Sequence, residues 1–91
     1  MATLLVSYDL KAPGRDYDEL YKLLKSTGTY SHPLESVWLV VTPLTTVQYR
    51  DALAKVVDAN DRLLVIDVSG DSAAWRNFSE ATSKWLKKHL K

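Results

Sequence analysis

The sequence contains no cysteine and only two histidines, which excludes two common kinds of site. Without thiols the chain forms neither disulfides nor a thiolate zinc centre, and His32 and His89 lack the spacing of zinc ligands. No apolar run approaches the ~20 residues of a membrane-spanning helix, and no signal-peptide pattern opens the chain. We therefore expect a soluble, cytoplasmic protein that makes no membrane contact.

Glycine is also scarce, and its three positions do not form a loop that could cradle phosphate. Gly14, Gly28 and Gly70 each fit a turn or the end of a helix instead. The remaining composition is ordinary, with 46% hydrophobic and 25% charged residues in a chain of 91. These values predict one small globular domain and exclude a disordered chain, but they select no function.

The net charge is only +1, but the charges are unevenly distributed. Residues 74–91 carry five basic side chains and one acidic one, a net charge of +4, whereas residues 1–73 carry seven basic and ten acidic ones, a net charge of −3. A basic end can bind nucleic acid or another acidic partner. It can also be a solvated helix face whose lysines the helix dipole stabilises. The candidates for contact with nucleic acid are Arg62, Arg76, Lys84, Lys87 and Lys88.

Hydrophobic periodicity predicts four strands and three helices. The predicted strands span residues 3–10, 29–31, 36–42 and 62–69. The predicted helices span residues 16–25, the segment from the capping box Thr45-Thr46-Val47-Gln48 to the residue before Asn60, and an amphipathic basic helix at 73–90. A turn is predicted at Lys11-Ala12-Pro13-Gly14. Without the last helix the order is βαββαβ, so we predict an α+β, ferredoxin-like core over 3–70 with an antiparallel sheet and an additional C-terminal helix.

In this fold both inner helices pack on one face of the sheet and leave the other face open. The side chains predicted to face the helices are Leu4, Val6, Tyr8, Val37, Leu39, Val41, Leu64, Ile66 and Val68. The open face is then predicted to hold Leu5, Ser7, Asp9, Trp38, Val40, Leu63, Val65 and Asp67. Five of these eight are apolar, too many to leave in water as one patch. We expect the last helix, the same face of a second chain, or both to cover them, which predicts a homodimer.

Asp9 is the main candidate for chemistry, because it ends a central strand on the predicted open face. The antiparallel neighbours should place Ser36 and Arg62 close to it. A carboxylate there can bind a divalent cation, although one carboxylate holds Mg²⁺ poorly and two copies of Asp9 across a dimer axis would hold it better. The alternative is a structural role, either as an ion pair with Arg62 or as an acceptor for turn amides.

The remaining chemistry-bearing side chains point less clearly to a site. His32, at a predicted hairpin tip, has an imidazole suited to proton transfer near neutral pH, but no orienting side chain is adjacent to it in the sequence. The aromatic residues invite base stacking, yet the spacing of Tyr17, Tyr21, Trp75 and Trp85 favours packing.

Three local patterns coincide in a way that resembles known families. The segment Val6-Ser7-Tyr8-Asp9 ends the first strand, Gly28 follows the first helix, and Ser36-Val37-Trp38 opens a buried strand. This set resembles the second CRISPR-associated protein family and the related virulence-associated protein D family. The chain is also similar to short bacterial proteins labelled "SinR family", through its Tyr-Asp-Leu, Ser-x-Trp and Leu-Leu-Val-Ile segments.

The resemblance implies a ferredoxin-like homodimer that binds nucleic acid and cleaves RNA or DNA with Mg²⁺. The family aspartate, which would be the metal ligand, maps onto Asp9, and the family serine maps onto Ser36, so these two residues are the implied catalytic pair. The alternative is a non-catalytic, dimeric protein-interaction module of the same fold. That alternative is favoured by the acidic body of the chain and by the stretch after Gly28, which starts without lysine or arginine.

Overall fold

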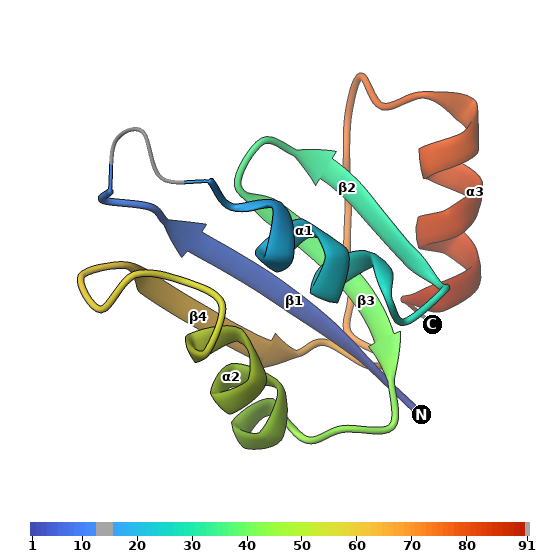
Figure 1. The fold of residues 1–91 in the computed structure, drawn as a ribbon. Coiled ribbons are helices and arrows are strands. Elements are labelled where there is room, and N and C mark those ends of the chain that lie inside the picture. The colour runs from blue at the N-terminus through green and yellow to red at the C-terminus, as the bar shows by residue number, and fades with distance from the viewer. Residues whose placement is uncertain (13–15, 91) are drawn as a thin grey trace.

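The computed structural model describes residues 1–12 and 16–90 as a four-stranded sheet with three helices (Figure 1). Pro13 and Gly14 of the predicted turn, and Lys91 of the basic end, lie outside the described residues. In chain order the elements are β1 (Ala2–Asp9), α1 (Asp18–Lys25), β2 (Tyr30–Leu34), β3 (Val37–Thr42), α2 (Thr46–Ala54), β4 (Arg62–Asp67) and α3 (Glu80–His89). All neighbouring strands are antiparallel, in the order β2-β3-β1-β4. The predicted α+β, ferredoxin-like fold with an additional C-terminal helix is confirmed.

The start of α2 follows its predicted capping box, but α2 ends at Ala54 and not just before Asn60, and α1 begins at Asp18 and not at residue 16. In α2 the predicted capping box forms, because the Thr45 hydroxyl accepts from the backbone N–H of Gln48 (3.1 Å) and the Gln48 side chain accepts from the backbone N–H of Thr45 (3.0 Å). α1 starts with two acidic residues and ends with Lys22 and Lys25, which matches the helix dipole at both ends.

The core lies between these two helices and one face of the sheet. Its fully buried side chains come from both layers: Leu4, Val6, Leu20, Leu24, Trp38, Val40, Tyr49 and Leu53. The view in Figure 1 looks onto this layer, with α1 and α2 in front of the strands.

The side chains of β1 that were predicted to face the helices do so. In β3 and β4 the prediction is wrong by one residue, so the opposite set of side chains faces the helices. The register sets Val6 opposite both Trp38 and Val65, so these side chains share the face that packs on the helices. The residues that were expected on the helix side and lie on the other face are Val37, Leu39, Val41, Leu64 and Ile66. Both segments are nearly continuous apolar runs, which give no alternation from which the facing could be read.

The last helix is shorter than predicted, because it covers Glu80–His89 and not 73–90. Asn77 has a φ of +64°, a left-handed conformation that interrupts a right-handed helix. Ser79 then caps the helix by accepting a hydrogen bond from the Thr82 amide at 3.1 Å. Trp75, in the irregular segment before α3, donates from its indole N–H to the Ser83 hydroxyl (3.0 Å) and so ties this segment to the helix.

The strand β2 is also longer than predicted and lies at an edge of the sheet. Pro33 lies within it, next to a shift in register between Ser31 and Leu34. Proline cannot donate to a strand ladder, so an edge strand with an irregular register is the place where it fits.

The helix α3 covers only part of the second sheet face. It lies beside β2 in Figure 1, and Thr3 of β1 donates from its hydroxyl to the carbonyl of His89 at 2.8 Å. Leu39 is buried on this half of the face, whereas Leu64 and Ile66 of β4 are 55% and 42% exposed. The chain's own last helix therefore covers the β2–β3 side and leaves the β4 side uncovered.

Candidate functional site

Asp9 lies at the exposed end of β1, where the register sets it opposite Arg62 of β4. Its carboxylate forms an ion pair with Lys11, with Oδ2 and Nζ 2.9 Å apart, and its side chain is 56% exposed. The cation that pairs with Asp9 is thus Lys11 and not Arg62. Because both side chains are exposed, this ion pair contributes little to stability. The carboxylate remains accessible to solvent.

Ser36 reaches the same end of the sheet from the turn between β2 and β3. Its backbone carbonyl accepts a hydrogen bond from the Tyr8 amide at 3.3 Å. Asp9 and Ser36 line one open cavity of about 310 Å³, and Glu35 lines it with them. Arg62 lines a smaller hollow of about 180 Å³ with Asp9. The structure therefore brings Asp9, Ser36 and Arg62 to one end of the sheet.

The donor set around Asp9 does not fit a magnesium centre within one chain. The ammonium of Lys11 already pairs with the carboxylate, and a bound cation would have to compete with it. Over residues 1–12 and 16–90, no three Asp, Glu or His side chains gather closely enough to hold a metal ion. Mg²⁺ prefers a near-octahedral set of oxygens, so a centre at this place would need a carboxylate from a second chain.

The basic residues of α3 form a separate set. Lys84, Lys87 and Lys88 share the outward side of the helix and are exposed, while Leu86 on the inward side is buried. Burial lowers the pKa of His89 in the last turn, and the neighbouring Lys88 charge lowers it further.

The structure divides the predicted nucleic-acid contacts into two places. Arg76 is exposed in the segment before α3, so it is close in sequence to the lysines of that helix. Arg62 begins β4, the edge strand at the opposite side of the sheet from β2 and α3 (Figure 1). The five predicted residues therefore do not form one surface.

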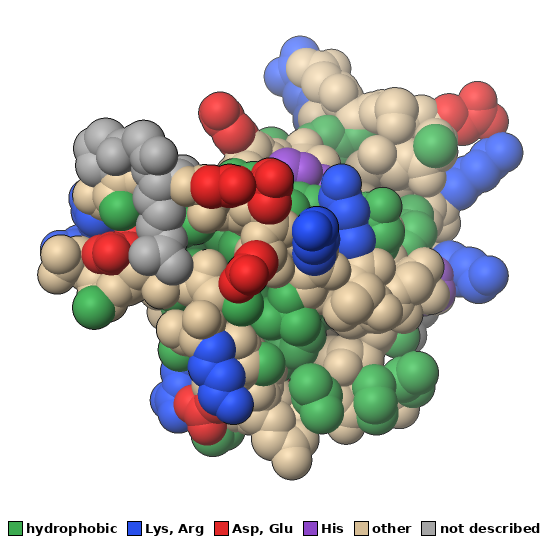
Figure 2. Space-filling model, viewed as in Figure 1, with side chains coloured by type: hydrophobic (Ala, Val, Ile, Leu, Met, Phe, Trp, Pro, Cys, Tyr) green, Lys and Arg blue, Asp and Glu red, His purple; other side chains and the backbone are tan. Residues whose placement is uncertain are grey.

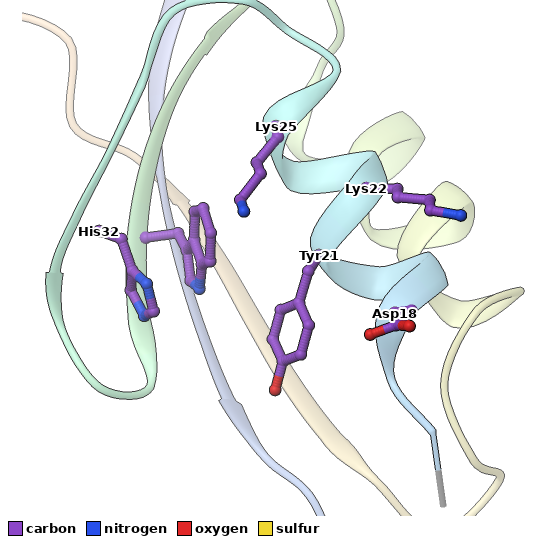
Figure 3. Close-up of a pocket in the computed structure, with 6 residues that line it drawn as sticks. Asp18, Tyr21, Lys22, Lys25 and His32 are labelled. Carbon is purple, nitrogen blue, oxygen red and sulfur yellow. The ribbon is translucent and has the colours of Figure 1, made fainter.

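A third place, a groove between α1 and β2, was missed by the sequence reasoning. It has a volume of about 460 Å³, and its lining side chains are Asp18, Tyr21, Lys22, Lys25, His32 and Trp38. Figure 3 shows His32 on β2 and Tyr21 on α1 at opposite sides of this groove, with Lys25 extending into the space between them. Figure 2 shows the same face from outside, where basic side chains lie next to a histidine.

Aromatic rings form the floor of this groove. The His32 ring stacks on Trp38 with centroids 3.9 Å apart and planes 15° apart, and Tyr21 stacks at 6.3 Å and 23°. Tyr30 also contacts Trp38, at 5.7 Å. Trp38 is only 2% exposed, so it is a fixed platform that holds the neighbouring rings.

Hydrogen bonds fix the orientation of this floor. Trp38 donates from its indole N–H to the Tyr8 hydroxyl at 3.0 Å. His32 Nε2 lies 2.9 Å from the carbonyl of Glu35, which can only accept, so Nε2 carries the proton and Nδ1 of the neutral ring is the acceptor. Burial raises the pKa of Tyr8, and the hydrogen bond from Trp38 offsets part of that rise.

One signal in the sequence points to this groove. The pairing of β2 with β3 sets Ser31 opposite Leu39, which brings the next residue along, His32, beside Trp38. His32 can be placed beside Trp38 only when Trp38 is assigned to the helix side of the sheet. The continuous apolar run of β3 does not indicate to which side Trp38 points.

None of the helices in the described part of the chain is long and apolar enough to cross a membrane. No protein-family model matches the chain.

Proposed function

We propose that the protein is a small, homodimeric nucleic-acid-binding protein that contacts the phosphate backbone through α3. The observation that carries this proposal is the row of Lys84, Lys87 and Lys88 on the outward side of a helix whose other side is packed on the sheet. Such a row presents its charges on one side of the helix, which suits a polyanion, although Lys84 also pairs with Glu80 at 3.3 Å.

The charge distribution of the whole chain supports an electrostatic contact of this kind. Residues 74–91 carry a net charge of +4, and the rest of the chain carries −3. The acidic body repels a polyanion and the basic end attracts it, so the bound orientation is set by charge. Contacts to phosphate carry no base information, and the binding is therefore expected to tolerate many sequences.

The homodimer in this proposal is supported by the uncovered side of the sheet. Leu64 and Ile66 are exposed on β4, whose outer edge pairs with no other strand among the described residues. An antiparallel pairing of two β4 strands about a two-fold axis would join both sheets and cover these side chains with their own copies.

Cleavage with Mg²⁺ is the further activity that the family resemblance implies, and it depends on this dimer. Lys11 already pairs with Asp9, and residues 1–12 and 16–90 of one chain hold no cluster of three side chains that could bind a metal ion. We therefore place cleavage second to binding, with Asp9 as the residue that a metal would need from both chains.

The protein-interaction module is the second candidate, and the same exposed Leu64 and Ile66 favour it. On that reading the β4 side binds a protein partner or a second copy, and the lysines of α3 are only a solvated face. The two candidates differ in how binding to a polyanion responds to salt.

The test is binding of the wild type to labelled single-stranded and double-stranded oligonucleotides over a series of salt concentrations. We expect the logarithm of affinity to fall linearly with the logarithm of salt, because phosphate contacts release counterions. The variant Lys87→Gln/Lys88→Gln removes two phosphate contacts and should reduce the slope by about 2.

The matched control is Arg50→Gln/Lys55→Gln, which removes the same charge from α2 and from the residue that follows it, where both side chains are exposed. This control should leave the slope close to that of the wild type. Weak oligonucleotide binding that does not respond to salt would reject the α3 contact and favour the protein-interaction module. An equal loss of affinity in both double variants would do the same.

A further inference from the structure

The groove between α1 and β2 combines flat aromatic surfaces with charges at two ends. Its volume of about 460 Å³ lies within the range of roughly 300–1,000 Å³ typical of small-molecule sites. The proposed contact of α3 with nucleic acid uses none of its residues. The groove is therefore independent of that contact.

The aromatic surfaces suit a planar ring. One face of His32 is stacked on Trp38, and the His32 side chain is otherwise exposed, so its outer face is accessible. Tyr21 is half-buried on the other side of the groove. Because Trp38 holds both rings in place, a ligand ring that stacks there orders little that is not already ordered.

The basic end of the groove suits an anion. Lys22 and Lys25 lie about one turn apart at the C-terminal end of α1. Among the described residues neither forms an ion pair. In Figure 3 Lys25 extends into the groove, while the Lys22 side chain points away from His32 and Tyr21. A phosphate at this end could pair with Lys25 directly and gain from the charge of Lys22.

The other end of the groove is acidic. Asp18 starts α1, about 10 Å along the helix from Lys25 at 1.5 Å per residue. Its carboxylate accepts hydrogen bonds from N–H donors. A ligand with N–H donors at one end, a flat ring and an anion at the other end matches this order.

A nucleotide has these three parts in that sequence. We propose that the groove between α1 and β2 binds a nucleotide, with the base against His32 and Tyr21 and the phosphate at Lys25 and Lys22. The nucleotide can be a free mononucleotide or the terminal residue of a single strand, since both present the same chemistry. This inference goes beyond the proposed function and stands without it, because it rests on different residues.

The test is isothermal titration calorimetry of the wild type with a purine 5′-mononucleotide, the matching nucleoside and inorganic phosphate. We expect one saturable site for the mononucleotide, and at least about tenfold weaker binding of the nucleoside and of phosphate, since each makes only part of the contacts. Lys25→Gln should weaken mononucleotide binding by about tenfold through loss of the charged contact.

The matched control is Lys55→Gln, an exposed lysine after α2 that lies outside the groove. A second variant, His32→Ala, should also weaken the binding of the mononucleotide. The thermal unfolding curve of this variant shows whether the fold is kept. Absence of saturable binding, or equal affinity in Lys25→Gln and Lys55→Gln, overturns the nucleotide groove.

A competition experiment separates the two sources of the nucleotide and the two proposals. Displacement of the mononucleotide by a short single strand identifies a strand terminus as a ligand of the groove, and retention of the mononucleotide identifies the free form. Mononucleotide binding without salt-dependent binding of oligonucleotides supports the groove and rejects the proposed function. Oligonucleotide binding that Lys87→Gln/Lys88→Gln removes, with no mononucleotide binding, rejects the groove alone.

Discussion

The hydroxyl of Thr3, near the start of β1, donates a 2.8 Å hydrogen bond to the backbone carbonyl of His89, in the last turn of α3. The two residues are 86 positions apart, so this bond joins the first and last elements of the chain. The His89 ring also contacts that of Trp85, one turn earlier in the same helix, with centroids 4.4 Å apart and planes tilted by 43°. The hydrogen bond from Thr3 helps to hold α3, and with it the lysine row, against the sheet.

Replacing Thr3 by valine should loosen α3 while leaving the rest of the fold in place. Valine keeps the shape of the side chain but removes the donor, which costs about 1 kcal/mol and lowers the melting temperature by roughly 4–8 °C in a domain of this size. Backbone amides of α3 should exchange faster with solvent, and those of β1 and β3 should not. The control is Thr29→Val, at a threonine whose hydroxyl makes no hydrogen bond to any described residue.

The hydroxyl of Tyr49 is buried and has no hydrogen-bond partner in the part of the chain that the structure describes, so Tyr49→Phe should stabilise the protein. Phenylalanine keeps the packing of the ring against the core and removes the uncompensated polar atom, a gain of about 1 kcal/mol that thermal unfolding would measure. A melting temperature below that of the wild type would show that the hydroxyl is satisfied in solution.

The same residue predicts how stability changes at high pH. Burial raises the pKa of Tyr49 to about 12, above its ordinary value of 10.0. The unfolded chain loses this proton first, so stability is fully present below pH 10 and falls as the pH rises toward 12. The wild type should therefore lose more stability than Tyr49→Phe over this range.

Replacing Leu64 by lysine should dissociate the proposed dimer. The side chain is 55% exposed in the single chain, so the charge is tolerated there, but two lysines facing each other across β4 strands repel. Light scattering should give the mass of a dimer for the wild type and of a monomer for Leu64→Lys. Val47→Lys, at an equally exposed apolar residue of α2, should leave the dimer intact.

Replacing Asp9 by alanine tests the activity implied by the family resemblance. Cleavage of RNA or DNA in the presence of Mg²⁺ or Mn²⁺ should be abolished, and the mass by light scattering should not change, because Asp9 is exposed at a strand end. Asp51→Ala, which removes an exposed carboxylate from α2, is the control. If the wild type leaves both RNA and DNA intact, the nuclease activity is rejected, and only the proposal of nucleic-acid binding remains.

The fold could be predicted because its local signals agree with one another. The alternation of β1, with Ser7 and Asp9 among apolar residues, fixed which side faces the helices, and the capping box located α2. The strand β3 lacks such markers, since Val37 to Val41 are all apolar, and its facing depends on tertiary packing.

That one ambiguity explains why the sequence indicated one site and hid another. Asp9 and Ser36 lie at the ends of segments whose order alone brings them together, so their neighbourhood was predictable. The groove depends on Trp38 lying under α1, and it was therefore not visible while Trp38 was assigned to the open face. The length of the last helix was overestimated because the aromatic spacing continues through Asn77, whose backbone does not.

The proline in β2 bears on how many copies can join. One border of the sheet is interrupted by Pro33 and flanked by α3, whereas the border formed by β4 is regular. A head-to-tail array needs two compatible borders, and only one is present. Assembly along this sheet should stop at a closed pair, which protects a chain with exposed apolar strand residues from growing into fibres.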